Sequence, residues 1–319
     1  MPFLRIKKWM DCMTPLRTFV LTTSLCMCAC TPAQTRISSS SKHTDSAHSH
    51  PATSGQTAPT QPDLSAPLPS ASVIRQRVLD GLHAMQAEQE RYLCRITSTG
   101  ERTDAQGNIL KTHTRTFDMF YVNGREIDQL IAKNGVPLDA SAQKKEFERV
   151  QKAIADDSNA AALAKQQSED EHQVDTMLHA LRYTNGHRIL RNGRTTLAYD
   201  LSGDPSFHPK NLQENFLHHM TGTMEVDEAT GQFVDVNAHL DHDVKIGGGL
   251  VANVHKGFWM HIHQTRQSDG VWINNLSEGQ GDARAALFFH PYFRFRQIVD
   301  SCHRTNVTTE TKVASAATP

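Results

Sequence analysis

The sequence predicts an α+β fold in which a few helices cover one face of an antiparallel β-sheet. Apolar and polar residues alternate along most of the chain after Tyr183, as they do in strands that bury one face. Three other segments repeat their apolar residues every three or four positions, which is the period of an α-helix. Because a sheet with one apolar face needs a cover, we expect these helices to supply it.

A helix over 73–89 and a β-hairpin are the first predicted elements. Ser72 is a suitable N-cap for this helix. Its apolar stripe consists of Ile74, Val78, Leu82 and Met85. From Tyr92 the apolar period changes to two, and a turn around Gly107 leads into a long return strand over 109–122.

A helical insertion separates this hairpin from the remaining predicted strands. The apolar positions of its two helices are Phe147, Val150 and Ile154, followed by Val174, Met177, Leu178 and Leu181. In the predicted strand over 232–240, Val234, Val236, Ala238 and Leu240 share one face. The alternate positions Asp235, Asn237 and His239 are polar, so we expect that face to meet solvent.

The first 29 residues resemble the signal peptide of a bacterial lipoprotein. A basic lead of Arg5, Lys7, Lys8 and Arg17 precedes a mostly uncharged run over 18–29. Ala29 stands directly before Cys30, which predicts cleavage there and makes Cys30 the lipid anchor. The uncharged run is shorter than the roughly 20 apolar residues that a transmembrane helix needs.

Several interpretations of this signal sequence stay open. Met13 could be the true start, and Cys26 and Cys28 are weaker alternative sites for the lipid. Ordinary cleavage near Ala29 without lipidation is the other possibility. Thr31, rather than an aspartate, follows the cysteine, so we expect an outer-membrane anchor with the protein facing the periplasm.

Composition divides the rest of the chain into three parts. Residues 30–72 are rich in Ser, Thr, Pro, Gln and His, which predicts a disordered tether behind the anchor. Residues 73–304 have the length of one globular domain, and 305–319 form a predicted disordered tail. The formal net charge of −1 gives no electrostatic reason to expect nucleic-acid binding.

Cys94 and Cys302 remain as the candidate disulfide of the exported domain. The other cysteines fall in the signal peptide or at the anchor, and exported domains commonly contain disulfides. Such a bridge would stabilise the fold by about 4–5 kcal/mol in the chain-entropy model. The alternative is a pair of buried thiols, because sequence does not show how far apart the two residues lie.

Short motifs along the domain resemble a known family. They are Tyr92-Leu93-Cys94, Asn123-Gly124-Arg125, Leu130, Asn134-Gly135, Pro137-Leu138, the stretch 246–252, Val254-His255-Lys256-Gly257, Gly270-Val271-Trp272 and Ile298-Val299. Together they resemble uncharacterised exported proteins, of the type common in acidobacteria, in the outer-membrane lipoprotein carrier and sorting (LolA/LolB-like) superfamily. The resemblance implies a strongly curved antiparallel sheet, an unclosed barrel, whose concave side holds the helices. It also implies a possible lipid or lipoprotein ligand.

Few residues in the sequence are candidates for a catalytic, metal-binding or anion-binding site. The string His239 to Asp243, with His261 and His263, could supply zinc ligands, but an exposed strand face explains these polar residues better, because no recognised ligand spacing is complete. Gly247-Gly248-Gly249 could cradle an anion, although a turn or bulge fits better. The sequence has no G-x-S-x-G elbow. We therefore assign no catalytic residue, no metal and no cofactor.

The sequence leaves three functional hypotheses. The first is a lipid-anchored, non-enzymatic binding module that buries an apolar ligand such as an acyl chain, a lipid or a lipoprotein. The second is an envelope sensor or protein-interaction module without a small ligand. The third, which the residues favour least, is a metal-dependent hydrolase built around His239.

Overall fold

The structure is a computed structural model that describes residues 63–305 except 124, 157–159, 247–251 and 286–291. The predicted signal peptide, the anchor Cys30, most of the tether, the Gly247 to Gly249 run and residues 306–319 lie outside the described residues. Among the described helices, none is long and apolar enough to cross a membrane.

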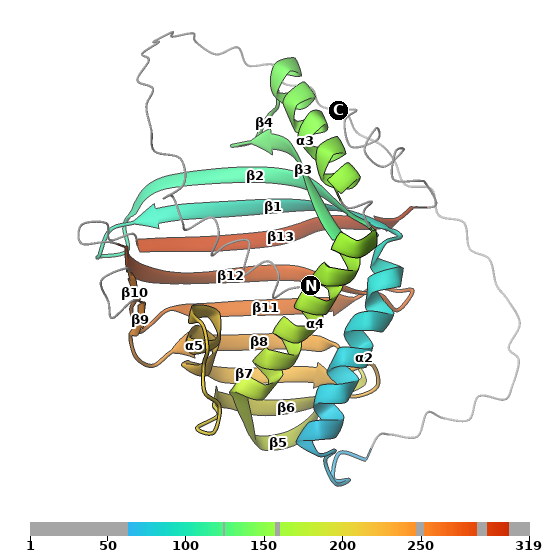
Figure 1. The fold of residues 1–319 in the computed structure, drawn as a ribbon, viewed down its shortest axis with the longest axis vertical. Coiled ribbons are helices and arrows are strands. Elements are labelled where there is room, and N and C mark those ends of the chain that lie inside the picture. The colour runs from blue at the N-terminus through green and yellow to red at the C-terminus, as the bar shows by residue number, and fades with distance from the viewer. Residues whose placement is uncertain (1–62, 124, 157–159, 247–251, 286–291, 306–319) are drawn as a thin grey trace, which may run out of the picture. The chain divides into compact units, whose positions relative to one another are not determined.

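One antiparallel sheet dominates the fold (Figure 1). Its strands are β1 (Tyr92–Thr103), β2 (Ile109–Val122), β3 (Arg125–Lys133), β4 (Val136–Pro137), β5 (Leu181–Arg191), β6 (Arg194–Gly203), β7 (Met220–Asp227), β8 (Phe233–Leu240), β9 (Val244–Ile246), β10 (Ala252–Val254), β11 (Trp259–Arg266), β12 (Trp272–Ala285) and β13 (Tyr292–Arg304). The main path runs β4-β3-β2-β1-β13-β12-β11-β8-β7-β6-β5, and β9 joins through β10, which pairs with β12. The path ends at β4 and β5, so the curved sheet is an unclosed barrel and the predicted fold class is confirmed.

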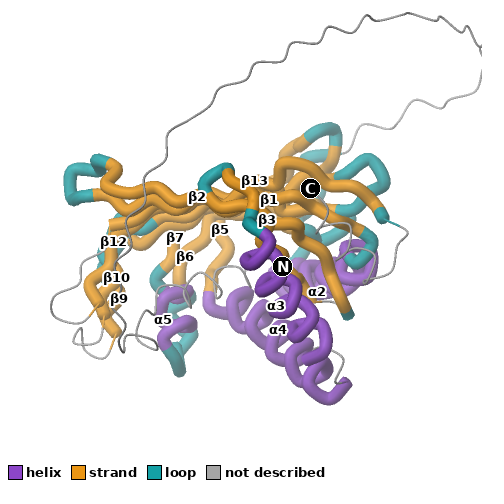
Figure 2. The backbone as a smooth tube through the Cα atoms, turned by 90° about the horizontal axis from the view of Figure 1, so that it is seen from above, coloured by secondary structure: helices purple, strands orange, loops and turns teal. Residues whose placement is uncertain are grey.

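Helices α2 (Ala71–Gln89), α3 (Ala140–Asp156), α4 (Ala160–Ala180) and α5 (Leu212–His218) complete the domain. Figure 2 shows α2, α4 and α5 on one side of the sheet. The structure confirms the helix predicted over 73–89, but it begins earlier and Ser70 caps it. The Ser70 hydroxyl accepts a hydrogen bond of 3.4 Å from the Val73 amide, whereas Ser72 lies inside the first turn. Leu181, predicted as helical, is the first residue of β5.

The alternating pattern produces one apolar face, as predicted. In β8 the side chains of Val236, Ala238 and Leu240 are buried, while Asn237 and His239 are exposed. The start of β1 is instead covered on both sides. Residues Tyr92, Cys94 and Ile96 pack in one cluster with Met85 of α2, while Leu93 packs with Val150 of α3 in another. Neighbouring residues of a strand point to opposite faces, so both sides are buried here.

The β7–β8 turn approaches the backbone of α2 closely at Gly231. This glycine has φ of 69°, in the left-handed region, and its amide donates a 2.8 Å hydrogen bond to the Asp227 carbonyl oxygen. A Cβ atom at this position would lie 2.0 Å from the carbonyl oxygen of Arg77. Gln232 strengthens the contact by donating a hydrogen bond to the Gly81 carbonyl oxygen. The turn therefore has no room for a side chain.

We expect Gly231→Ala to lower the free energy of unfolding by about 3 kcal/mol, because it adds both backbone strain and a clash with α2. Gly193→Ala is the matched control. Gly193 also has a positive φ, 76°, in a hairpin turn, but an added Cβ would meet nothing within 4 Å. That variant should lose only about 1 kcal/mol. Urea unfolding of both variants measures the difference, and equal losses would contradict the close packing of this turn on α2.

Candidate functional site

A small apolar cavity lies between the sheet and helices α4 and α5. Its volume is about 40 Å³. The lining residues are Met177, Leu178, Leu181, Tyr183, Leu201, Phe216, Leu217, Met220, Thr221, Met224, Val236, Ala238 and Met260. None of these described residues is charged, and the strands that contribute to the floor are β5, β6, β7, β8 and β11. The cavity can therefore hold apolar groups.

Helix α5 forms the cover at one side of this cavity. Asn211 caps it, because its Oδ1 accepts a 2.9 Å hydrogen bond from the Glu214 amide while Glu214 Oε1 accepts one of 2.6 Å from Asn211 Nδ2. Phe216 anchors the helix through an edge-to-face contact with Phe258, with ring centroids 5.3 Å apart. The helix was missed in the sequence because seven residues, about two turns, show too little periodicity.

Tyr183 supplies a polar group at the edge of the cavity without giving it charge. Its hydroxyl donates a 2.9 Å hydrogen bond to the carbonyl oxygen of Leu178, and its ring meets that of Tyr199 edge-to-face. Burial raises the pKa of the Tyr183 hydroxyl far above its usual range. The phenol therefore stays neutral and serves to fix the end of α4 against β5.

The lining is adaptable even though the cavity is small. Four of its residues are methionines, namely Met177, Met220, Met224 and Met260. Methionine is unbranched and polarisable, so it repacks around different apolar shapes at low cost. A cavity of about 40 Å³ is far below the roughly 300 Å³ of the smallest usual ligand pockets. An acyl chain could enter only if these side chains or α5 move.

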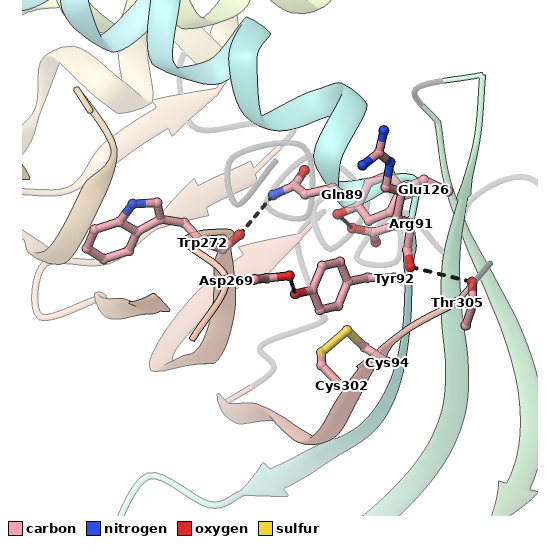
Figure 3. Close-up of a disulfide and its surroundings, with 10 residues drawn as sticks. Gln89, Arg91, Tyr92, Cys94, Glu126, Asp269, Trp272, Cys302 and Thr305 are labelled. Carbon is pink, nitrogen blue, oxygen red and sulfur yellow. Dashed lines mark hydrogen bonds between the residues drawn. A yellow bond between two sulfur atoms is a disulfide. The ribbon is translucent and has the colours of Figure 1, made fainter. Parts of the chain in front are cut away.

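A disulfide joins Cys94 of β1 to Cys302 of β13 (Figure 3). The two residues are register partners with Cα atoms 4.1 Å apart. Because β1 and β13 lie near opposite ends of the domain sequence, the disulfide closes a long loop. Nearby, the Tyr92 hydroxyl donates a 2.5 Å hydrogen bond to Asp269. Burial, together with the hydrogen bond to Asp269, raises the pKa of Tyr92 to about 12. These contacts tie the ends of the domain together and have a structural role.

The His239 string does not gather around one point. His239 lies 3.0 Å from Asp241 and 3.1 Å from the hydroxyl of Thr221, and both members of the pair are about half exposed. Asp243 instead accepts a 2.9 Å hydrogen bond from the Lys256 amide. This bond, with one from Asn253, holds the pKa of Asp243 below its usual value. His239 and Asp241 therefore lie at an exposed strand end, whereas Asp243 contacts a loop, so these residues do not form one site.

His261 and His263 meet a different carboxylate, that of Asp235. Asp235 Oδ2 lies 2.9 Å from Nε2 of His261 and 2.9 Å from Nδ1 of His263. These residues lie on the sheet face opposite the cavity, where polar side chains alternate with the apolar ones. Sequence reasoning missed Asp235 as a partner. Two sequence features could have predicted this contact: the His-x-His spacing in one strand and the aspartate on the polar face of another.

No protein-family model and no curated protein matches this chain. Among solved structures, a match is the "Crystal structure of MucB in complex with MucA(peri)", at 10% sequence identity. The match covers 75% of this chain and 100% of that chain, with a TM-score of 0.19. A similarity this weak carries no argument, so membership of the LolA/LolB-like superfamily stays a prediction.

Proposed function

We propose that this protein is a non-enzymatic binding module of the bacterial cell envelope that holds an apolar ligand, such as an acyl chain of a lipid or lipoprotein, between its sheet and α5. The observation that carries the proposal is the methionine-rich, uncharged lining of the cavity beneath α4 and α5. Each methylene buried there would contribute about 0.8 kcal/mol. Binding would come from apolar burial alone, without covalent chemistry.

Opening of α5 would enlarge the cavity. With seven residues it is the shortest of the described helices, and it meets the cavity through Phe216 and Leu217, so its displacement would admit a chain. The methionine side chains would then repack along the ligand. The free energy of displacing α5 would be offset by burial of roughly ten methylenes, which contribute about 8 kcal/mol before the entropy losses of binding.

The proposed anchor would hold this cavity near a membrane. Arg188 of β5 donates a 3.1 Å hydrogen bond to the carbonyl oxygen of Pro67, and Glu228 holds its guanidinium with two bonds of 2.8 Å. These contacts hold the segment at Pro67, which would follow the proposed tether, against Arg188 of β5, a strand that also lines the cavity. A flexible tether over 31–62 would span roughly 30 Å, enough to let the domain turn toward the bilayer.

A filling substitution tests the proposal. We expect Ala238→Leu to occupy the cavity and to weaken displacement of a fluorescent fatty acid at least about tenfold, which corresponds to about 1.4 kcal/mol. Ala198→Leu is the matched control, because Ala198 and Ala238 are each 8% exposed in neighbouring parts of the sheet. Ala198 is paired with Glu225 on the opposite face, so its variant should bind as the wild type does. Equal binding by both variants would place the ligand elsewhere.

A second candidate is a protein-interaction module that uses the β5 edge. In the part of the chain that the structure describes, β5 ends the sheet and Leu190 on it is 41% exposed, so the part of its outer edge beyond the Arg188–Pro67 contact could accept an added strand. A wild-type protein that binds no fatty acid in the displacement experiment would favour this function over the first.

A further inference from the structure

We propose that Asp235, His261 and His263 form a zinc site on the polar face of the sheet. The site is separate from the apolar cavity and does not depend on the proposed function. Among the described residues, this is the set of histidine and acidic side chains whose ligand atoms come together as a metal site requires, all within 4.8 Å of one another. Two imidazole nitrogens and one carboxylate oxygen are ligands that Zn²⁺ prefers.

The strand geometry explains why these three residues meet. His261 and His263 are two positions apart in β11, so their side chains leave the same face of the sheet. His263 is the register partner of Asp235 in β8, and His261 is the partner of Asn237. The carboxylate therefore lies beside both rings, at 2.9 Å from a nitrogen of each.

Two neighbouring residues orient the proposed ligands. Asn237 donates a 2.6 Å hydrogen bond to Oδ1 of Asp235, which leaves Oδ2 directed at the histidines. Glu278 of β12 lies 3.5 Å from Nδ1 of His261. A proton held at Nδ1 by this carboxylate leaves the Nε2 lone pair for the metal, the arrangement that zinc-binding histidines commonly show. Arg296 lies 3.4 Å from Glu278 and steadies it.

Access and distance are both compatible with zinc. The side chains of Asp235, His261 and His263 are 21%, 24% and 39% exposed, so an ion can enter from solvent and keep a water as fourth ligand. Zinc bonds of about 2.0–2.2 Å would place the ligand atoms roughly 3.3 Å apart in a tetrahedron. The carboxylate–imidazole distances of 2.9 Å therefore need to open by only a few tenths of an ångström. The metal would replace the hydrogen bonds and release their protons.

Zinc titration of the full-length chain tests this site, with Co²⁺ absorbance as a second readout of the ligand set. We expect His263→Ala to weaken the tightest zinc site at least about 100-fold and Glu278→Gln to weaken it about 10–100-fold. His239→Ala is the matched control, because His239 lies on the same face two residues from Asn237 and pairs with Asp241 instead. It should bind zinc as the wild type does.

The chain has 18 histidines, so the site must be distinguished from weaker ones. Far-ultraviolet circular dichroism of each variant checks that it folds. A His261→Ala/His263→Ala double variant that folds and keeps the tightest site would overturn the proposal, as would a wild type without a stoichiometric zinc site. Loss of that site and of the Co²⁺ band in the double variant, with fatty-acid binding unchanged, would support it.

Discussion

Reduction of the Cys94–Cys302 disulfide is expected to lower the free energy of unfolding by about 5 kcal/mol, the largest single effect that the fold predicts. The bridge closes a loop with a sequence separation of 208 residues. In the chain-entropy model, a loop of this length restricts the unfolded chain by about that amount. The bridge also fastens β1 to β13, the pairing that joins the beginning of the sheet to its end.

Denaturant unfolding with and without a reductant measures this effect. The Cys94→Ala/Cys302→Ala variant is the control, because it retains the other cysteines but should be insensitive to the reductant. Cys94 is fully buried, so the double variant also reports the cost of removing its sulfur, which reduction alone does not. A wild type whose stability does not change on reduction, while the two thiols become reactive, would contradict the prediction.

Loss of the Asp227 carboxylate should be the most damaging single change to a polar group. Asp227 is fully buried and accepts hydrogen bonds of 2.6 and 2.8 Å from Arg194. It also accepts bonds from the amide and hydroxyl of Thr230, at 2.9 and 2.7 Å. We expect Asp227→Ala to cost about 3 kcal/mol, because the Thr230 turn and the guanidinium of Arg194, whose side chain is 31% exposed, lose their partner.

Glu225→Ala is the matched control for this variant. Glu225 lies two residues earlier in the same strand and forms a two-bond pair with Arg191. This pair is the more exposed of the two: Glu225 and Arg191 are 14% and 55% exposed, against 1% and 31% for Asp227 and Arg194. The control should therefore lose about 1 kcal/mol or less. Similar losses of unfolding free energy for both variants would show that burial does not set the strength of the Asp227 pair.

The Asp227 carboxylate also makes the stability of the fold depend on pH. Burial acts to raise the pKa of Asp227, but hydrogen bonds from Arg194 and Thr230 outweigh it and hold the pKa below its usual range. The stabilisation is therefore complete above the unfolded-state pKa and is lost as the pH falls through the lower folded-state pKa. Stability below about pH 4 should accordingly depend less on pH in Asp227→Asn than in the wild type.

Local patterns predicted most elements. The return strand over 109–122 has the predicted bounds. Asn192 and Gly193, a residue pair typical of tight hairpin turns, have positive φ values of 50° and 76°. The short helix α5 was not predicted. It is stabilised by the contact of Phe216 with Phe258, which lies far away in the sequence, as well as by its own capping residues. The cavity could not be predicted from the sequence either, because its existence depends on how closely α4 and α5 pack against the strands.

The sequence by itself determined which face of each strand is apolar and where the helices lie along the chain, because periods of two and 3.6 are local properties. The tertiary structure decided the order of the strands and the register between them. A slip of two residues between β8 and β11 keeps every side chain on its face, so alternation cannot select the register. That register decides that His263 lies opposite Asp235, while His239, prominent in the sequence, lies opposite Trp259.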